Sequence, residues 1–210
     1  MTTARDEMLA RVRTALRGGA EPAGSIPRGY RETGTEPPGS PALLELLTDR
    51  LVDYRATVYR ASPDTVGQTV AEVLAQILPA GGRVLVPPGL PAGWVPEGAV
   101  RDDGTLTHAE LDAMAAVLTG CAAAAAETGT IALDGSPGQG RRAVTLIPDR
   151  HICVVPAEVV VETVPELLSR LDPTRPLTFI SGPSATSDIE LSRVEGVHGP
   201  RTLVVVLVAQ

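Results

Sequence analysis

The sequence predicts an α/β domain built on a mostly parallel sheet flanked by helices. Apolar segments of strand length alternate with amphipathic segments of helix length from about residue 41 to the end of the chain. Turns rich in glycine and proline separate these segments. Strands that alternate with helices are typical of a parallel sheet with helices on both faces. A chain of 210 residues is long enough for one such domain with a substantial core.

Residues 1–40 predict a helix followed by an extended arm. Apolar side chains recur at helical spacing between Ala4 and Arg17, and two glycines then end the pattern. From Gly19 to Pro41 the chain is rich in Gly, Pro, Ser and Thr and has few large apolar residues. A structureless loop of this length is unusual inside a compact domain. We therefore expect an arm over residues 1–40 and the α/β domain over residues 41–210.

The rest of the chain predicts the alternating elements in order. We expect helices over residues 43–53, 62–78, 107–119, 164–171 and 187–193, and strands over residues 56–59, 83–86, 122–126, 131–133, 143–147, 152–155, 177–180 and 202–208. Two of the helix starts carry specific signals. Ser62 is a suitable N-cap ahead of Pro63, and Thr107 forms a capping box with Glu110.

One of these strands is a run of alanines, Ala122–Ala126. Alanine favours helices, but the run is short and turns flank it at Gly120 and Gly129. We interpret it as a buried strand that is packed too tightly for larger side chains.

Charge and hydropathy exclude two classes of partner. The formal net charge of −7 is spread over positions of mixed sign without a basic stripe, so we expect no nucleic acid partner. The longest apolar run, Leu203–Ala209, is far shorter than the roughly 20 residues of a membrane-spanning helix, so we expect no membrane span. Charged residues interrupt the N-terminal segment, unlike a secretory signal, and we expect a cytoplasmic location.

Two residue types limit the chemistry. All eighteen basic side chains are arginines, and the lack of lysine excludes a Schiff base and a Walker-type phosphate loop. The two cysteines, Cys121 and Cys153, lie in unrelated sequence contexts and cannot alone hold a four-cysteine iron–sulfur cluster. No His-x-x-x-His or equivalent spacing occurs. We expect this chain to bind no cofactor and no metal tightly.

The segment Ser181–Asp188 is the strongest candidate binding loop. It follows a predicted strand and precedes a predicted helix, and ligands of parallel α/β sheets bind outside the carboxyl ends of the strands. Its candidate ligand-binding residues are Gly182, Ser184, Thr186, Ser187 and Asp188. The glycine permits close backbone approach, and hydroxyls with free backbone N–H groups suit a phosphate or carboxylate. The alternative is that the loop only caps the helix.

A turn between two predicted strands offers a carboxylate and two hydroxyls. Glu127 is the best candidate nucleophile or base, because burial can raise the pKa of a carboxyl at a strand end toward neutrality. Thr128 and Thr130 are candidate ligand-binding residues beside it. The alternative is a polar hairpin turn.

Arginine and histidine could join this site. Arg142 follows a glycine-rich loop, and His151 follows Asp149 and Arg150 between two predicted strands. Arginine binds carboxylates in a bidentate geometry. The alternative is a solvated, salt-bridged turn, which we favour for Arg150 and for Arg141.

Several ordered motifs resemble the LUD-domain family, and within it the lactate-utilisation protein C group. They are Glu127-Thr-Gly-Thr130, Gly140-Arg-Arg142, Pro148-Asp-Arg-His151, Ser181-Gly-Pro-Ser-Ala-Thr-Ser-Asp-Ile-Glu190 and Gly196-Val-His-Gly-Pro200. The resemblance implies a fold similar to that of the phosphosugar isomerase and CoA-transferase (NagB/RpiA-like) superfamily. It also implies a role beside iron–sulfur partner subunits in oxidising L-lactate to pyruvate, with the clusters on those partners. Glu127 is similar in setting to the strand-end glutamate nucleophile of CoA-transferases.

Three functions stay open at this point. The first is a component of an L-lactate utilisation system that has no redox centre of its own and binds a small anionic metabolite or a partner. The second is a stand-alone enzyme of acyl, CoA or phosphosugar chemistry that uses Glu127. The third is a metabolite-binding module.

Overall fold

The computed structural model describes residues 3–17, 27–186, 194–196 and 198–209. The chain forms two compact units, Met1–Arg31 and Glu32–Gln210. The first unit contains helix α1 (Ala4–Leu16), which confirms the predicted N-terminal helix. A capping box between Thr3 and Asp6 starts α1, and none of its residues is buried.

The second unit holds the α/β fold. Its helices are α2 (Pro41–Asp53), α3 (Val66–Ile77), α4 (His108–Asp112), α5 (Arg142–Leu146) and α6 (Val164–Ser169), with 3-10 helices η1 (Ala92–Trp94) and η2 (Ala157–Val159). Its strands are β1 (Thr57–Ala61), β2 (Val84–Val86), β3 (Val100–Arg101), β4 (Ala116–Thr119), β5 (Ala123–Ala125), β6 (Thr130–Leu133), β7 (Arg150–Pro156), β8 (Val160–Val161), β9 (Thr178–Ile180), β10 (Ala185–Thr186), β11 (Val194–Glu195) and β12 (Thr202–Val208).

The main sheet has six strands in the order β1-β12-β7-β4-β2-β3, and every neighbouring pair is parallel. Its central strands β7 and β12 pair along their whole lengths, from Arg150 opposite Thr202 to Pro156 opposite Val208. A second sheet, in the order β8-β5-β6-β9, is mostly antiparallel. The predicted α/β class with a mostly parallel sheet flanked by helices is confirmed.

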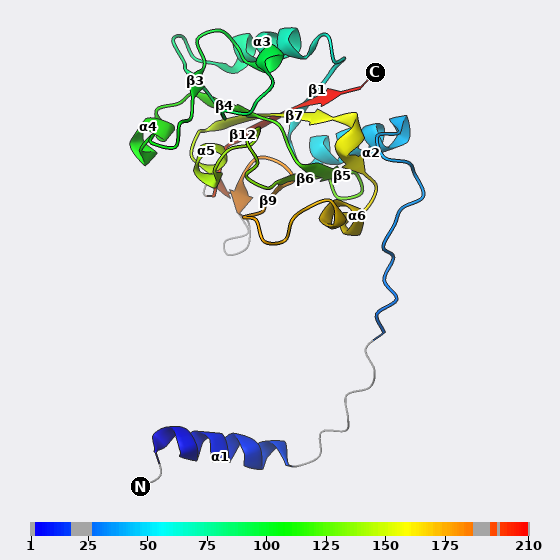
Figure 1. The fold of residues 1–210 in the computed structure, drawn as a ribbon, viewed down its shortest axis with the longest axis vertical. Helices are drawn as coiled ribbons and strands as arrows, with labels where there is room; N and C mark the ends of the chain where they lie inside the picture. Colours follow the sequence, from blue (N-terminus) through cyan, green and yellow to red (C-terminus); the bar gives the residue numbers. More distant parts are fainter. Residues whose placement is uncertain (1–2, 18–26, 187–193, 197, 210) are drawn as a thin grey trace. The chain divides into compact units, whose positions relative to one another are not determined.

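Both faces of the main sheet are covered. Helix α3 packs on one face, where Val70 and Val73 contact alternate residues of β2, β4, β7 and β12. Helix α2 and the second sheet cover the other face, where Leu47 and Leu51 pack with the remaining alternate residues of β7 and β12. Figure 1 shows α3 on one side of β1 and β7, and β5, β6 and α6 on the other. Burial on both faces explains the nearly continuous apolar sequence of Thr202–Val208.

The alanine run is a strand, as predicted. Ala123, Ala124 and Ala125 form β5 and are fully buried, with β6 on one side and β8 on the other. Alanines fit here because α6 packs against one face of β5 and the α2 cluster against the other.

The predicted helix over residues 107–119 is wrong in its second half. The Thr107–Glu110 capping box does start helix α4, but α4 ends at Asp112. Residues 116–119 form strand β4 instead, with Val117 and Leu118 fully buried between β2 and β7. Burial on both faces selects the extended conformation that the helical start signal could not exclude.

The predicted strand over residues 143–147 is also wrong, because this segment forms helix α5. Its apolar residues lie at helical spacing: Val144 is fully buried against Leu111 and Met114, and Ile147 packs on the same cluster.

The helix predicted to begin at Ser62 begins later, at Val66 with Thr65 as its N-cap residue. The Thr65 hydroxyl accepts a hydrogen bond from the Ser62 N–H at 2.9 Å, which forms a turn before the helix.

Candidate functional site

The carboxyl edge of the main sheet contains a point where the chain changes direction. After β2 the chain moves outward to the edge strand β3, whereas after β4 it moves the other way, toward β7 and β12. β2 and β4 are neighbours in the sheet, so the loops that follow them run in opposite directions. Open α/β sheets bind ligands at such a switch point.

A glycine-rich loop, Asp134–Gly140, fills the space between these two strand ends. The Gly89 N–H, after β2, donates to the Pro137 carbonyl at 3.0 Å. The Gly120 N–H, after β4, donates to the Gly138 carbonyl at 2.9 Å. A Cβ at position 89 would overlap Pro137, so the close approach requires glycine there. These two hydrogen bonds tie the Asp134–Gly140 loop to the switch point.

A cavity of about 920 Å³ opens beside this loop, and we call it the switch-point cavity. It is lined by Pro88, Asp102, Asp103, Gly104, Gly135, Pro137, Gly140, Arg141, Arg142, Arg175 and Pro176. Its walls come from the carboxyl ends of β2 and β3, the glycine-rich loop, the start of α5 and the segment before β9. Three arginines and two aspartates give it a mixed but net positive charge.

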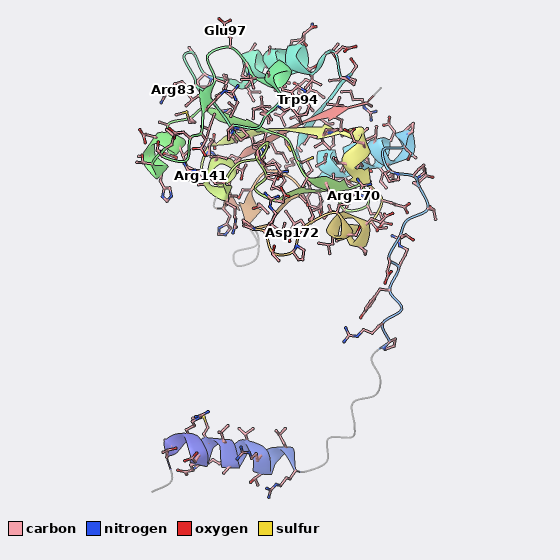
Figure 2. The ribbon with its side chains drawn as sticks, in the orientation of Figure 1. Arg83, Trp94, Glu97, Arg141, Arg170 and Asp172 are labelled. Atoms are coloured by element: carbon pink, nitrogen blue, oxygen red, sulfur yellow. The ribbon has the colours of Figure 1, made fainter. Side chains whose placement is uncertain are left out.

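Arg141 is engaged in the structure. Its guanidinium donates to both carboxylate oxygens of Asp102 at 3.0 Å and to the Leu106 carbonyl at 2.9 Å. The hydrogen bond to Asp102 raises the pKa of Arg141 above its ordinary value. Asp102 is only 6% exposed and accepts a further bond from the Gly104 N–H. The Arg141–Asp102 pair fixes the carboxyl end of β3 to the N-cap residue of α5. Arg141 is labelled in Figure 2.

Arg175 is engaged as well, since it pairs with Asp134 at 3.2 Å. Burial raises the pKa of Asp134, but hydrogen bonds from Ser136 and the charge of Arg175 outweigh it and leave the pKa below its ordinary value. Arg142 differs from both arginines. It is exposed, and its guanidinium makes no hydrogen bond or ion pair within the described part of the chain.

A second cavity, of about 440 Å³, shares Arg142 with the first, and we call it the Ser181 cavity. It is lined by Tyr54, Arg142, Leu146, Thr178, Phe179, Ile180, Ser181, Gly182, Pro183, Ser184, His198, Gly199 and Pro200. The structure thus brings together three predicted site residues, Arg142, Gly182 and Ser184. It adds Tyr54 and His198, which the sequence did not single out for this site.

Two of the predicted binding groups in the loop have structural partners. A Cβ at Gly182 would lie 2.7 Å from the Tyr54 carbonyl oxygen. The lack of a side chain at Gly182 therefore lets the loop backbone pack closely against Tyr54. The Ser184 hydroxyl accepts the His198 N–H at 3.1 Å, and the Ser184 N–H donates to the Pro200 carbonyl at 2.8 Å. These bonds fix the loop against the Gly196–Pro200 motif and leave the Ser184 hydroxyl a hydrogen to donate.

The predicted threonines join the same loop through hydroxyl groups. Thr128 Oγ1 lies 2.8 Å from Thr130 Oγ1, which lies 3.1 Å from the Ser181 Oγ. This row of hydroxyls connects the β5–β6 turn to the start of the Ser181 loop.

The predicted location of the Ser181–Asp188 loop, at the carboxyl edge of the parallel sheet, is wrong. The loop follows β9, which is the edge strand of the second sheet and runs antiparallel to β6, so it does not leave the carboxyl edge of the parallel sheet. Thr186 lies in β10, which pairs antiparallel with β11. Ser187, Asp188 and the rest of the predicted helix 187–193 lie outside the described residues.

Glu127 lies at the β5–β6 turn, away from the lining of both cavities. Its N–H donates to the Glu162 carbonyl at 3.0 Å, and its carbonyl accepts from Arg50 Nε at 3.2 Å. The structure therefore ties this turn to α2 and β8, and does not bring Glu127 to Arg142.

His151 lies in the core and lines neither cavity. It is 2% exposed, and its Nε2 lies 2.8 Å from the Thr119 Oγ1 of the neighbouring strand. Burial lowers the pKa of His151 to about 4, so the ring is neutral at physiological pH. Asp149 pairs with Arg201 and Arg150, and the hydrogen bond from Arg201 is the main cause of its lowered pKa.

The two cysteines, Cys121 and Cys153, share one environment although they lie far apart in the sequence. Both are free thiols, and both pack in the cluster around α2. A hydrogen bond with Cys153, together with burial, raises the pKa of Cys121 well above its ordinary value, which makes the thiol a poor nucleophile.

Within the described ranges, His, Cys, Asp and Glu form no group that could hold a metal ion. No helix described here is long and apolar enough to cross a membrane.

The arrangement suits recognition of an anion. Arg142 offers a guanidinium at the border of two cavities, and hydroxyls and backbone groups of the Ser181 loop surround one of them. Sequence reasoning missed Asp102, Tyr54 and Arg175. The carboxyl-end rule would have found Asp102 had the two-residue strand β3 been recognised.

Comparisons with known proteins agree with the motifs. The LUD domain family matches residues 82–208. The chain is 46% identical to the Lactate utilization protein C of Deinococcus radiodurans, over 96% of this chain and 94% of that relative. It is 40% identical to the Lactate utilization protein C of Shouchella clausii, over 36% of this chain and 35% of that relative.

A solved structure is also similar. It is the crystal structure of a DUF162 family protein from Deinococcus radiodurans, with a TM-score of 0.67 and 41% identity, and it covers 80% of this chain and 97% of that chain. The family match spans more than half of the sequence, and the Deinococcus relative is similar over nearly its whole length. The motifs predicted this outcome correctly: the chain belongs to the LUD-domain family.

Proposed function

We propose that this protein is a component of an L-lactate utilisation system and binds a small anionic metabolite at Arg142. The observation that carries the role is the similarity, over nearly the full chain, to a relative named Lactate utilization protein C. In this proposal the chain has no redox centre of its own, acts in the cytoplasm, and works beside iron–sulfur subunits that accept the electrons.

The anion site is supported by the position of Arg142. It lines both the switch-point cavity and the Ser181 cavity, and its guanidinium has no partner among the described residues. A carboxylate beside it would gain a charge-assisted pair, and the Ser184 hydroxyl and the Ser181 loop backbone offer further donors. A stand-alone enzyme that uses Glu127 has less support, because Glu127 is not among the lining residues of either cavity.

The role is tested by growth on L-lactate. A strain that lacks this gene should not grow on L-lactate as sole carbon source, and the wild-type gene should restore growth. The protein should also co-purify with iron–sulfur subunits. Normal growth of the deletion strain on L-lactate would remove the proposed role.

The site is tested separately with purified protein. L-lactate, pyruvate and inorganic phosphate serve as probes in thermal-shift and calorimetric titrations. Replacing Arg142→Ala should weaken binding of the anion by about tenfold or more, because a hydrogen bond to a charged group contributes about 1.5–3 kcal/mol.

Arg83→Ala is the matched control, since Arg83 is exposed and precedes β2 at the opposite end of that strand. Equal affinities of the Arg142 and Arg83 variants would reject the site while leaving the growth result, and hence the role, intact.

A further inference from the structure

A third cavity lies at the carboxyl ends of β1, β12 and β7, and we call it the Trp94 cavity. Its volume is about 870 Å³. It is lined by Pro38, Gly39, Pro41, Leu44, Arg60, Pro63, Val66, Trp94, Pro156, Ala157, Glu158, Val208 and Ala209. None of the sequence motifs falls in it, and it shares no lining residue with the two cavities at Arg142. Its size and its place at the carboxyl edge are those of a small-molecule site.

The walls of this cavity are held in place by close backbone contacts. The Gly39 N–H donates to the Val160 carbonyl at 2.9 Å, and a Cβ at Gly39 would lie 2.8 Å from the Ala157 carbonyl oxygen. Gly39 also has a φ of +72°, which favours glycine. The prolines at positions 38 and 41 are therefore fixed against η2. On the other side, a Cβ at Gly67 would overlap the Gly93 carbonyl oxygen, so α3 and η1 are in direct contact.

Trp94 gives the cavity an aromatic wall, and it is the sole tryptophan of the sequence. Its Cζ3, on the six-membered ring, points toward Gly120, where an added Cβ would lie 3.8 Å away. The indole is partly buried against the α3 cluster, beside which Figure 2 labels it. Its Nε1–H donates to no residue in the described part of the chain, although a tryptophan N–H at an apolar wall usually has a partner.

Two charged side chains complete the lining. The exposed carboxylate of Glu158 makes no hydrogen bond or ion pair with any described residue. Arg60 is already paired, with Glu45 at 3.0 Å and with Thr48 at 3.2 Å. The cavity thus offers a flat aromatic surface, one N–H donor and one carboxylate acceptor that the protein itself does not use.

We propose that the Trp94 cavity binds an aminated heteroaromatic ring, the chemistry of a nucleoside such as adenosine. The flat ring stacks on the indole, as nucleobases do on aromatic side chains. Its exocyclic amino group donates to Glu158, and a ring nitrogen or ribose oxygen accepts the indole N–H. This site is independent of the anion site at Arg142.

The single tryptophan supplies the assay. Adenosine is titrated into the full-length protein while indole fluorescence is followed, with excitation at the red edge of the indole absorption to avoid the absorption of the base. We expect a saturable change in fluorescence and a rise in the thermal midpoint. Purine riboside, which lacks the amino group, should bind about tenfold more weakly, since it cannot donate to Glu158.

Variants locate the site. Glu158→Gln should weaken adenosine binding by about tenfold in calorimetry, and Trp94→Ala by a similar factor through loss of stacking. Glu97→Gln is the matched control, because Glu97 is exposed, follows Trp94 closely in sequence and lines a different cavity. It should leave the affinity unchanged. If Trp94→Ala does not fold, the comparison of the two glutamate variants still decides the matter.

Three results with adenosine would overturn the proposal, and a fourth would replace its ligand. The three are no saturable signal with adenosine at millimolar concentration, equal affinities for adenosine and purine riboside, or equal affinities of the Glu158→Gln and Glu97→Gln proteins. Binding of a proline-rich peptide at Trp94 in place of adenosine would likewise replace a nucleoside site with a peptide groove.

Discussion

Removing Arg141 should leave a buried carboxylate without its main partner. Asp102 is 6% exposed and accepts two hydrogen bonds from the Arg141 guanidinium. Breaking a fully buried pair from one side costs about 3–5 kcal/mol. The cost should be smaller here, because the Arg141 side chain is 35% exposed and the Gly104 N–H at 3.3 Å remains on Asp102. We expect Arg141→Ala to lower the free energy of unfolding by about 2–3 kcal/mol.

Urea unfolding followed by circular dichroism measures this loss. It should move the midpoint by about 1 M if the denaturant slope is about 2.5 kcal/mol/M. Arg142→Ala is the control, since Arg142 is adjacent, exposed and without a partner in the described residues, and it should change stability by less than about 0.5 kcal/mol. The double variant Asp102→Asn with Arg141→Ala should cost less than the sum of the single changes. Equal midpoints for the two arginine variants would refute the reasoning.

Three further predictions concern stability. Burial holds the pKa of His151 at about 4 in the folded protein, whereas a histidine in the unfolded chain has a pKa near 6.5. The free energy of unfolding should therefore be highest above about pH 6.5, and protonation of His151 in the unfolded chain should lower it by roughly 2.5 kcal/mol by about pH 4.5. Urea midpoints measured across this range should fall less steeply for His151→Gln, and identical slopes would contradict the assignment. Gly182→Ala should cost about 1–3 kcal/mol, because the new Cβ would lie 2.7 Å from the Tyr54 carbonyl oxygen, whereas Gly93→Ala meets no atom within 4 Å and should be nearly neutral. Glu162→Ala should expose residues 32–40 to limited proteolysis, because one Glu162 oxygen accepts the N–H groups of Thr35 at 2.6 Å and Glu36 at 2.8 Å; an unchanged cleavage rate would show that other contacts hold this segment.

The local sequence signal predicted where helix α4 begins but not where it ends. The capping box of Thr107 and Glu110 is made by neighbouring residues, so the sequence alone specifies it. The end of α4 depends on Val117 and Leu118, which become a strand because β2 and β7 lie on either side of them. β2 and β7 are distant from residue 117 in the sequence, so the residues next to position 117 do not indicate that these strands will flank it.

The candidate site was also predictable only in part, because its location depends on residues that are distant in the sequence. Three of the predicted site residues, Arg142, Gly182 and Ser184, line one cavity. Gly182 and Ser184 were expected at the carboxyl end of a parallel strand, but β9 pairs antiparallel with β6 in a second sheet that the sequence did not predict. His151 illustrates the converse. A histidine beside Asp149 and Arg150 has the chemistry of a site, and only its burial shows that the core holds it.

Arg141 and Arg142 are adjacent and chemically identical, yet the fold gives them different tasks. Asp102 at the end of β3 binds Arg141, the N-cap residue of α5, and thereby fixes the first residue of that short helix, which is Arg142. The guanidinium proposed to bind the anion is therefore positioned by its neighbour. It follows that Arg141→Lys, which keeps the charge but loses the bidentate geometry, should weaken anion binding at Arg142 without removing any group that touches the ligand. If Arg141→Lys destabilised the fold but left the affinity for the anion unchanged, the two arginines would be uncoupled, and the position of Arg142 would have to be set by the packing of Val144 alone.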